Sequence, residues 1–242
     1  MNKQKTLAIA NALIYGVMVF VNIALQNTEV TTASVSDKYL TLLTPSGLTF
    51  MIWILIFGLL LIFTVKELMS DEDSGVGLLY MISSLLNIAW VILWHYEMIF
   101  ISLVVIMALA FVLSMIVRKL RTNNSTLTRM TFSVYYAWVS VASIISIFVF
   151  FTSLNKGAFD LPVIRLLSAL TLCLLVIPLY MYKDDLAYIL VYVWAIVGII
   201  IRHINEFNSA YMEILITAFI LVLVCGAFIY NYFDQKRKRV NG

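Results

Sequence analysis

The chain has 242 residues, of which 63% are hydrophobic and 12% are charged, and its formal net charge is +3. Soluble domains average roughly 45–50% apolar and about 25% charged residues, so this composition excludes an ordinary soluble domain. Apolar runs of about 20 residues recur from end to end, which predicts an all-α, polytopic helical membrane protein.

Eight membrane spans are predicted. The first follows a basic N-terminus like that of a signal peptide, but it is long enough to span and is interpreted as a retained signal anchor. The third and fourth are joined only by residues 95–97, which predicts a tight helical hairpin. The seventh is short, its limits are open by several residues, and a tilted or partly re-entrant helix is one interpretation of it. In chain order the spans are residues 6–25, 48–66, 76–94, 98–117, 130–152, 162–182, 187–202 and 210–232.

The basic residues test this count independently. If the spans alternate from a cytoplasmic N-terminus, 12 of the 16 basic residues lie inside, and the four outside are Lys38, Lys156, Arg165 and Arg202. The positive-inside rule therefore favours eight spans with both termini cytoplasmic. We expect a multi-pass protein of the plasma membrane, surrounded by the lipid bilayer. Nucleic-acid binding is not predicted, because the basic residues flank spans and form no aromatic-interleaved surface.

Several kinds of chemistry lack their usual residues. No ionisable residue falls at the centre of a proposed span, which disfavours proton-coupled carriers and ion pumps. Metal-ligand spacings, a P-loop and a nucleophile elbow are also missing, so no metal site and no catalytic residue are predicted.

Two groups of polar residues near span ends leave alternatives open. His95 and Glu97 fit either the polar mouth of a pocket or a hairpin turn with interfacial aromatics. Glu206 and Glu213, near Arg202, allow the same two interpretations.

One helix face in the third span carries three groups that can hydrogen-bond. Asn87, Trp90 and Trp94 are spaced i, i+3 and i+7, so they share a face. Polar groups at membrane depth usually find partners inside the protein. With aromatic residues of the second and fifth spans, this face predicts a slot for a flat, largely apolar ligand oriented by indole and amide groups. The alternative is that the aromatics only fill helix interfaces. The candidate ligand-binding residues are Pro45, Phe50, Trp53, Phe57, Asn87, Trp90, Trp94, Tyr135, Trp138 and Ala142.

Three segments resemble motifs of a known family. Residues 44–57, TPSGLTFMIWILIF, resemble the TPxGxxFxIWxxIY signature of tryptophan-rich sensory proteins, the TspO/MBR family. Residues 86–90, LNIAW, match its LNxxW helix, and residues 132–142 resemble its YxxWVxxA helix. The sequence departs from the family pattern at Phe57, where tyrosine is usual, at Thr131, where many relatives have proline, and at Ser146, where shorter members have asparagine.

The resemblance covers residues 6–152, and the family core is a five-helix bundle. It therefore implies a TspO/MBR-like membrane core at residues 1–152. Residues 153–242 would form three additional helices with a basic cytoplasmic tail, similar to the extra C-terminal helices of longer members.

The resemblance also implies a function. Family members bind flat hydrophobic molecules, notably tetrapyrroles such as haem and protoporphyrin, and have been given sensory, transport and tetrapyrrole-degrading roles. No histidine or cysteine is well placed here to ligate iron, so a porphyrin-type ligand would be held by stacking and shape. Three functions stay open: a ligand-binding sensor or carrier, a structural or interaction protein, and an enzyme acting on a lipid or tetrapyrrole. Gly198 and Gly226 permit the close helix contact of a homo-oligomer, although no GxxxG motif specifies one.

Overall fold

The computed structural model describes residues 3–70, 74–121, 125–155, 161–207 and 211–241. These residues form helices and no strands, and eight helical segments are long and apolar enough to cross a membrane. The prediction of an all-α, polytopic membrane protein with eight spans is therefore confirmed. The elements are α1 (Lys3–Gln26), α2 (Thr32–Lys38), the 3-10 helix η1 (Gly47–Met51), α3 (Ile52–Met69), α4 (Gly77–His95), α5 (Ile99–Leu120), α6 (Thr126–Leu154), α7 (Pro162–Leu174), α8 (Val176–Met181), α9 (Leu186–Asn205) and α10 (Met212–Asn241).

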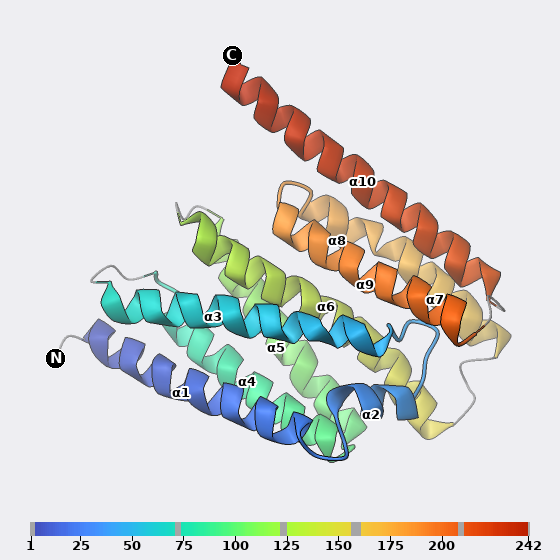
Figure 1. Cartoon of the computed structure of the whole chain (residues 1–242), viewed down its shortest axis with the longest axis horizontal. Helices are drawn as coiled ribbons and strands as arrows, with labels where there is room; N and C mark the ends of the chain where they lie inside the picture. The colour runs from blue at the N-terminus through green and yellow to red at the C-terminus, as the bar shows by residue number, and fades with distance from the viewer. Residues whose placement is uncertain (1–2, 71–73, 122–124, 156–160, 208–210, 242) are drawn as a thin grey trace.

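Five of the long helices close into a ring. Around it the order is α1, α3, α6, α5 and α4, and α4 packs back against α1. The helices α7 to α10 lie on the α3–α6 side of this ring, and α10 is the farthest from α1 (Figure 1). Contact between the two groups is made by α9, which packs against α6 and η1. The short helix α2 lies across the end of the ring at which α4 finishes, called here the α2 end. The opposite end, where α3 finishes near Lys66 and α6 begins, is called the basic end.

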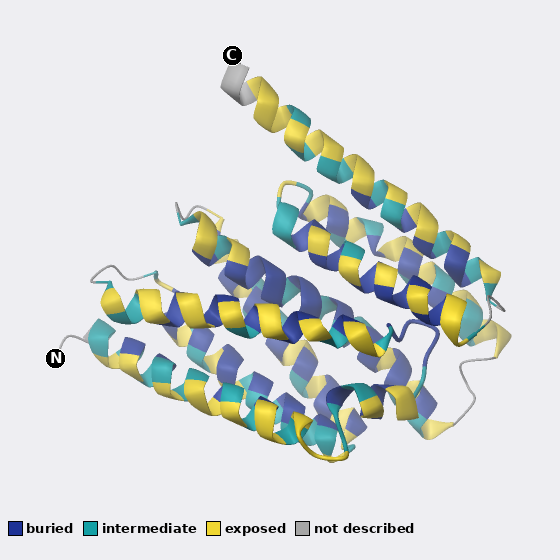
Figure 2. Ribbon diagram, in the orientation of Figure 1, coloured by how far each residue is buried: buried dark blue, intermediate teal, exposed yellow. Residues whose placement is uncertain are grey.

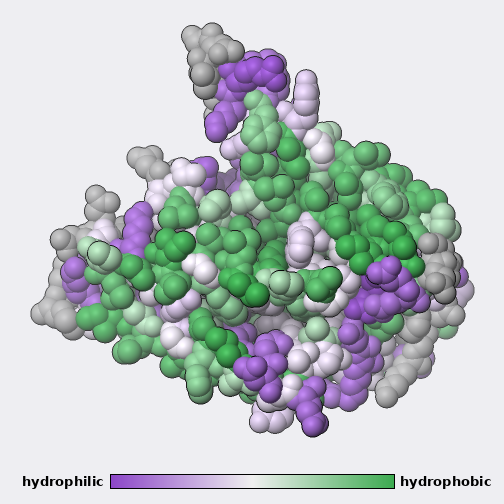
Figure 3. Space-filling model, viewed as in Figure 1, coloured by the Kyte–Doolittle hydropathy of each residue, from purple (hydrophilic) through white to green (hydrophobic). Residues whose placement is uncertain are grey.

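Apolar side chains cover the outside of the bundle as well as filling it. Buried residues line the inward sides of the helices, while leucines and isoleucines on the outer sides stay exposed (Figure 2). Hydrophobic residues dominate the middle of the visible face, and hydrophilic ones gather around α2 and at the end of α10 (Figure 3). This is the distribution of a chain whose surrounding solvent is a bilayer.

Two spans differ from their predicted form. The seventh is a regular helix of 20 residues, α9, which continues past the predicted end at residue 202, and Arg202 and His203 near its end bond to the carbonyl groups of Pro45 and Leu42. The sixth is divided into α7 and α8. Pro178 has no N–H for the carbonyl of Leu174 and its ring crowds that carbonyl, so the helix breaks there.

The helix α2 falls in the polar interval between the first two predicted spans and was not predicted. It begins with a capping box, in which the Thr31 hydroxyl accepts from the Ser34 N–H at 3.1 Å and the Ser34 hydroxyl accepts from the Thr31 N–H at 2.7 Å. Its seven residues are too few to give an apolar pattern of span length.

At Gly198, α9 packs closely against η1 and the residues that precede it. A Cβ atom at this position would overlap the side chain of Thr49 and would lie 3.0 Å from Cβ of Pro45. The Ser46 N–H donates to the Gly198 carbonyl at 3.0 Å, and the Trp194 indole donates to the Thr49 carbonyl at 2.9 Å. Gly198, which the sequence offered for a contact between copies of the chain, therefore packs against Thr49 and Pro45 of its own chain.

Replacing Gly198 tests this contact. Gly198→Ala should lower the stability by about 1–3 kcal/mol, because the added methyl group forces η1 away from α9. The readout is the thermal unfolding midpoint in detergent. Gly226→Ala is the matched control, since a Cβ there meets nothing within 4 Å. Equal midpoints for the two variants would contradict the contact.

Candidate ligand site: an aromatic pocket beneath α2

Aromatic rings from three helices of the ring meet near the α2 end. Trp53 of α3 stacks on Trp90 of α4 with ring centroids 5.7 Å apart, and Trp90 is followed by Trp94 at 6.1 Å. Phe50 of η1 meets the edge of Trp138 of α6 at 5.9 Å. The aromatic residues that the sequence singled out on three spans therefore lie together.

These residues surround a small cavity of about 30 Å³. Seven of the ten predicted site residues line it, and the other three lie behind its wall. Phe57 stacks on the far side of Trp53 at 5.5 Å, and Tyr135 meets Trp53 edge-on at 6.1 Å, while Asn87 is fully buried in α4. A liquid water molecule occupies about 30 Å³, so the cavity in this closed form has room for little else. Its lining is Thr32, Ser36, Pro45, Phe50, Trp53, Trp90, Trp94, Trp138, Ala142, Ile145 and Ser146.

Two donors on the cavity wall have no acceptor in the described part of the chain. They are the indole N–H groups of Trp90 and Trp138, and both are buried. Behind the wall, the Asn87 side chain and the Tyr135 hydroxyl lie against each other. Leaving a buried donor unsatisfied costs about 1–3 kcal/mol, so two indole donors on one cavity wall need an explanation other than packing.

The oxygen of Asn87 does have a partner, and it comes from α1. The Asn22 side-chain nitrogen donates to Asn87 Oδ1 at 3.0 Å and to the Met18 carbonyl at 2.9 Å. The sequence raised the question of whether Asn87 bonds to a ligand or to a neighbouring helix. Its oxygen bonds to the neighbouring helix α1, and its amide group also lies against the Tyr135 hydroxyl of α6.

The cavity is covered by α2 and by the segment that follows it to Ser46, called here the cover. Thr32 and Ser36 of α2 face the cavity, and the Trp94 indole donates to the Thr32 carbonyl at 3.1 Å. The Glu97 carboxylate, at the turn between α4 and α5, forms an ion pair with Lys38 at 2.5 Å.

Glu97 also accepts a hydrogen bond from the Tyr39 hydroxyl at 2.7 Å. The hydrogen bonds to Glu97 raise the pKa of both Lys38 and Tyr39, because the carboxylate favours the protonated form of each. The hairpin turn therefore anchors the cover.

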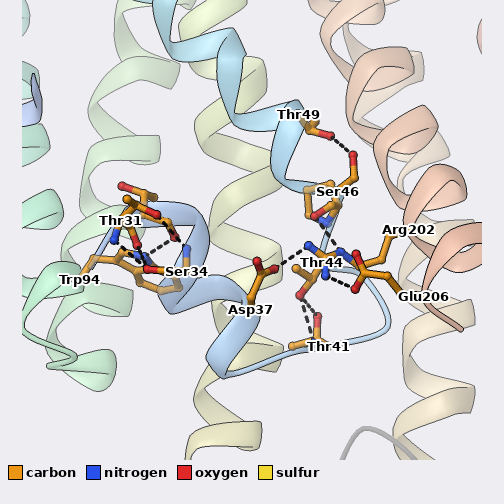
Figure 4. Close-up of polar contacts among 12 residues, drawn as sticks. Thr31, Ser34, Asp37, Thr41, Thr44, Ser46, Thr49, Trp94, Arg202 and Glu206 are labelled. Carbon is orange, nitrogen blue, oxygen red and sulfur yellow. Dashed lines mark hydrogen bonds and ion pairs between the residues drawn. The ribbon is translucent and has the colours of Figure 1, made fainter. Parts of the chain in front are cut away.

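Arg202 of α9 holds the other side of the cover. Its side chain is only 3% exposed and forms ion pairs with Asp37 of α2 and Glu206, each at 2.5 Å (Figure 4). Its Nε donates to the Pro45 carbonyl at 3.1 Å. The neighbouring His203 bonds to the Leu42 carbonyl at 2.8 Å. Sequence reasoning placed Arg202 and Glu206 together at a span end but had no signal for the role of Arg202 in holding the cover.

The other carboxylate considered together with Arg202, Glu213, lies away from the cover. Glu213 of α10 pairs with Arg165 of α7 at 2.5 Å. Among the described residues, no three histidine, cysteine, aspartate or glutamate side chains gather where they could hold a metal ion.

A ring of spanning helices around a covered aromatic cavity defines a polytopic membrane protein with an internal, largely apolar site. A family model described as TSPO-like protein matches residues 8–230, and the chain belongs to this family. The resemblance read from three motifs is thereby confirmed, and the match also takes in the helices beyond residue 152. Searches of the curated proteins and of the solved structures found no match.

Arg202→Gln should destabilise the protein by about 1–3 kcal/mol, because the Pro45 carbonyl loses a charged donor and two ion pairs are lost. The thermal midpoint and the rate of proteolysis within residues 39–46 would report the change. The control is Arg165→Gln, which removes an ion pair with half-exposed partners and should change the stability by less than about 1 kcal/mol. If both substitutions lowered the thermal midpoint and raised the proteolysis rate equally, Arg202 would not stabilise the cover more than an ordinary surface ion pair does.

Proposed function

We propose that the aromatic pocket binds a flat, hydrophobic molecule carrying hydrogen-bond acceptors, of the tetrapyrrole type, and that the protein serves in sensing or transport. The observation that supports this best is that two residues lining the cavity, Trp90 and Trp138, each bury an indole N–H that has no acceptor in the described part of the chain. A ligand with ring nitrogen or carboxylate acceptors would satisfy them while its faces stack on the rings.

Binding requires the cover to move. Ligand pockets usually have volumes of about 300–1,000 Å³, against about 30 Å³ here. At the rim of the cover, the ion pair of Lys38 with Glu97 has both partners partly exposed, and such a pair exchanges with water at low cost. If the half-exposed Asp37 leaves, the buried Arg202 keeps Glu206 and the Pro45 carbonyl as acceptors. A ligand that binds only the open form would shift the protein toward it.

The chemistry of the lining favours stacking over metal ligation. No histidine or cysteine is among the residues that line the cavity. A porphyrin would be held by the tryptophan faces and by hydrogen bonds at its rim, with no axial ligand from the wall.

We infer further that the protein lies in the plasma membrane with both termini in the cytoplasm. The excess of basic residues on one side of the eight spans supports this orientation. The α2 end then faces the outside, and the ligand enters from there.

Removing each unpaired indole N–H tests the proposal. Trp90→Phe and Trp138→Phe should each weaken protoporphyrin binding about tenfold, or about 1.4 kcal/mol, because a donor to the ligand is lost while a ring remains. The readout is the Soret absorbance of the porphyrin, which does not depend on tryptophan fluorescence. Trp194→Phe is the control, since that indole N–H already bonds to the Thr49 carbonyl outside the pocket.

The same variants separate the alternative functions. If Trp90→Phe and Trp138→Phe bind protoporphyrin as the parent protein does but unfold at lower temperature, the aromatics only pack the helices. An enzyme would instead consume the porphyrin under light and oxygen, and would lose that turnover in Asn87→Leu.

Loosening the cover should speed binding. Asp37→Asn removes one ion pair and leaves Arg202 bonded to Glu206 and to the Pro45 carbonyl. Stopped-flow quenching of porphyrin fluorescence should show association about threefold faster or more, because a binding-competent state is populated more often. Glu213→Gln breaks an ion pair away from the cover and should leave the rate unchanged. An unchanged rate in Asp37→Asn would contradict the role of the cover.

A further inference from the structure

A second and much larger cavity lies between the ring and the C-terminal helices. Its volume is about 590 Å³, and it shares no lining residue with the aromatic pocket. Its walls belong to α3, α6, α9 and α10. It is called here the groove, and it is lined by Met51, Ile52, Leu55, Leu59, Thr126, Arg129, Met130, Val134, Asp184, Asp185, Leu186, Ala187, Leu190, Val191, Trp194 and Tyr232.

Most of the groove is apolar and faces the bilayer. Leu55 of α3 and Leu190 of α9 are about half exposed, and Trp194 is 43% exposed. Each lies on a membrane-spanning helix. The volume falls within the range of about 300–1,000 Å³ that is typical of ligand sites. This part of the groove suits a hydrocarbon chain.

Charged groups of both signs lie at one end of the groove. Arg129 stands in the first turn of α6, at the basic end, and Asp184 lies two residues before α9. No hydrogen bond or ion pair of either side chain is found in the described part of the chain, although both line one cavity. A guanidinium and a carboxylate that share a cavity without pairing leave room for a group between them.

The other charged groups nearby are already engaged. Asp185 caps α9 by accepting from the Tyr188 N–H at 3.2 Å, and it also accepts from the Ser133 hydroxyl. Lys66 donates to the Ser125 hydroxyl at 2.9 Å, and Lys183 lies over the ring of Tyr180. Among the charged residues that line the groove, Arg129 and Asp184 are therefore the two that are available to a ligand.

We propose that the groove binds a membrane phospholipid with a primary-amine headgroup, phosphatidylethanolamine. Arg129 takes the phosphate, Asp184 takes the ammonium group, and one acyl chain runs along α3 and α9 toward Trp194. Arginine binds phosphate through several N–H donors, and a carboxylate accepts hydrogen bonds from an ammonium group. A choline headgroup has no N–H to donate, and an anionic headgroup meets the charges of Asp184 and Asp185 without an amine to offset them.

Competition among lipids tests the assignment. The full chain in detergent is mixed with equal amounts of phosphatidylethanolamine, phosphatidylcholine and phosphatidylglycerol of identical acyl chains, and retained lipid is measured by native mass spectrometry. Phosphatidylethanolamine should be retained about fivefold more than the other two. Asp184→Asn should remove this preference, and Arg129→Gln should lower the retention of all three lipids.

Matched variants decide whether the lipid sits in the groove. Arg118→Gln removes one positive charge at the same end of the bundle, on α5 and outside the groove, and should leave the retention pattern of the parent. Leu190→Trp fills the apolar part and should lower retention of every lipid. Equal retention of the three lipids by the parent, or equal losses in Arg118→Gln and Arg129→Gln, would overturn the proposal in favour of unspecific annular lipid.

This site is independent of the aromatic pocket. The groove variants should bind protoporphyrin with the affinity of the parent, because the two cavities have no residue in common. Loss of lipid selectivity with unchanged porphyrin binding, and the reverse, therefore report on different proposals.

Discussion

A buried guanidinium at the end of α9 is the constraint on which the arrangement around the pocket depends. Arg202 is only 3% exposed, and a charge placed there needs acceptors that replace its water. They come from Asp37, Glu206 and the Pro45 carbonyl, so the end of α9 is tied to the cover. The same helix then presents Gly198 to the turn before α3, where no larger residue fits. The C-terminal helices thus help to shape the closed aromatic site.

The tryptophans are not equivalent. Trp94 and Trp194 donate to backbone carbonyls of Thr32 and Thr49, whereas Trp90 and Trp138 line the cavity and have no acceptor in the described part of the chain. If shape and apolar surface were all that mattered, phenylalanine would fill the last two positions without burying an unpaired donor. This contrast between bonded and unbonded indoles is the physical basis for proposing a ligand.

The two cavities differ in what surrounds them. The aromatic pocket is enclosed by side chains and by the cover, and in our proposal its ligand is selected by stacking and by a few donors. The groove is walled by lipid-facing helices and ends in charged groups, which suits an amphipathic molecule already present in the bilayer. If both proposals hold, one chain combines a site for a rare ligand with a site for an abundant membrane component.

Sequence alone determined the number of spans, because hydrophobic length is a local property, and it also identified the family through three short motifs. The sequence also predicted that the aromatic residues gather at one site, since helical spacing decides which side chains share a face. Only the tertiary structure decided which of them line the cavity, and it placed Phe57 and Tyr135 behind the wall.

Two polar contacts join residues that are far apart in the chain. Asn22 bonds to Asn87, 65 positions away, and Arg202 pairs with Asp37, 165 positions away. No local pattern encodes such contacts, because they depend on how distant helices pack. The small volume of the pocket and the existence of the groove have the same origin. The sequence therefore predicted which residues would gather, and the packing of the helices decided which of them line the cavity and which contact each other.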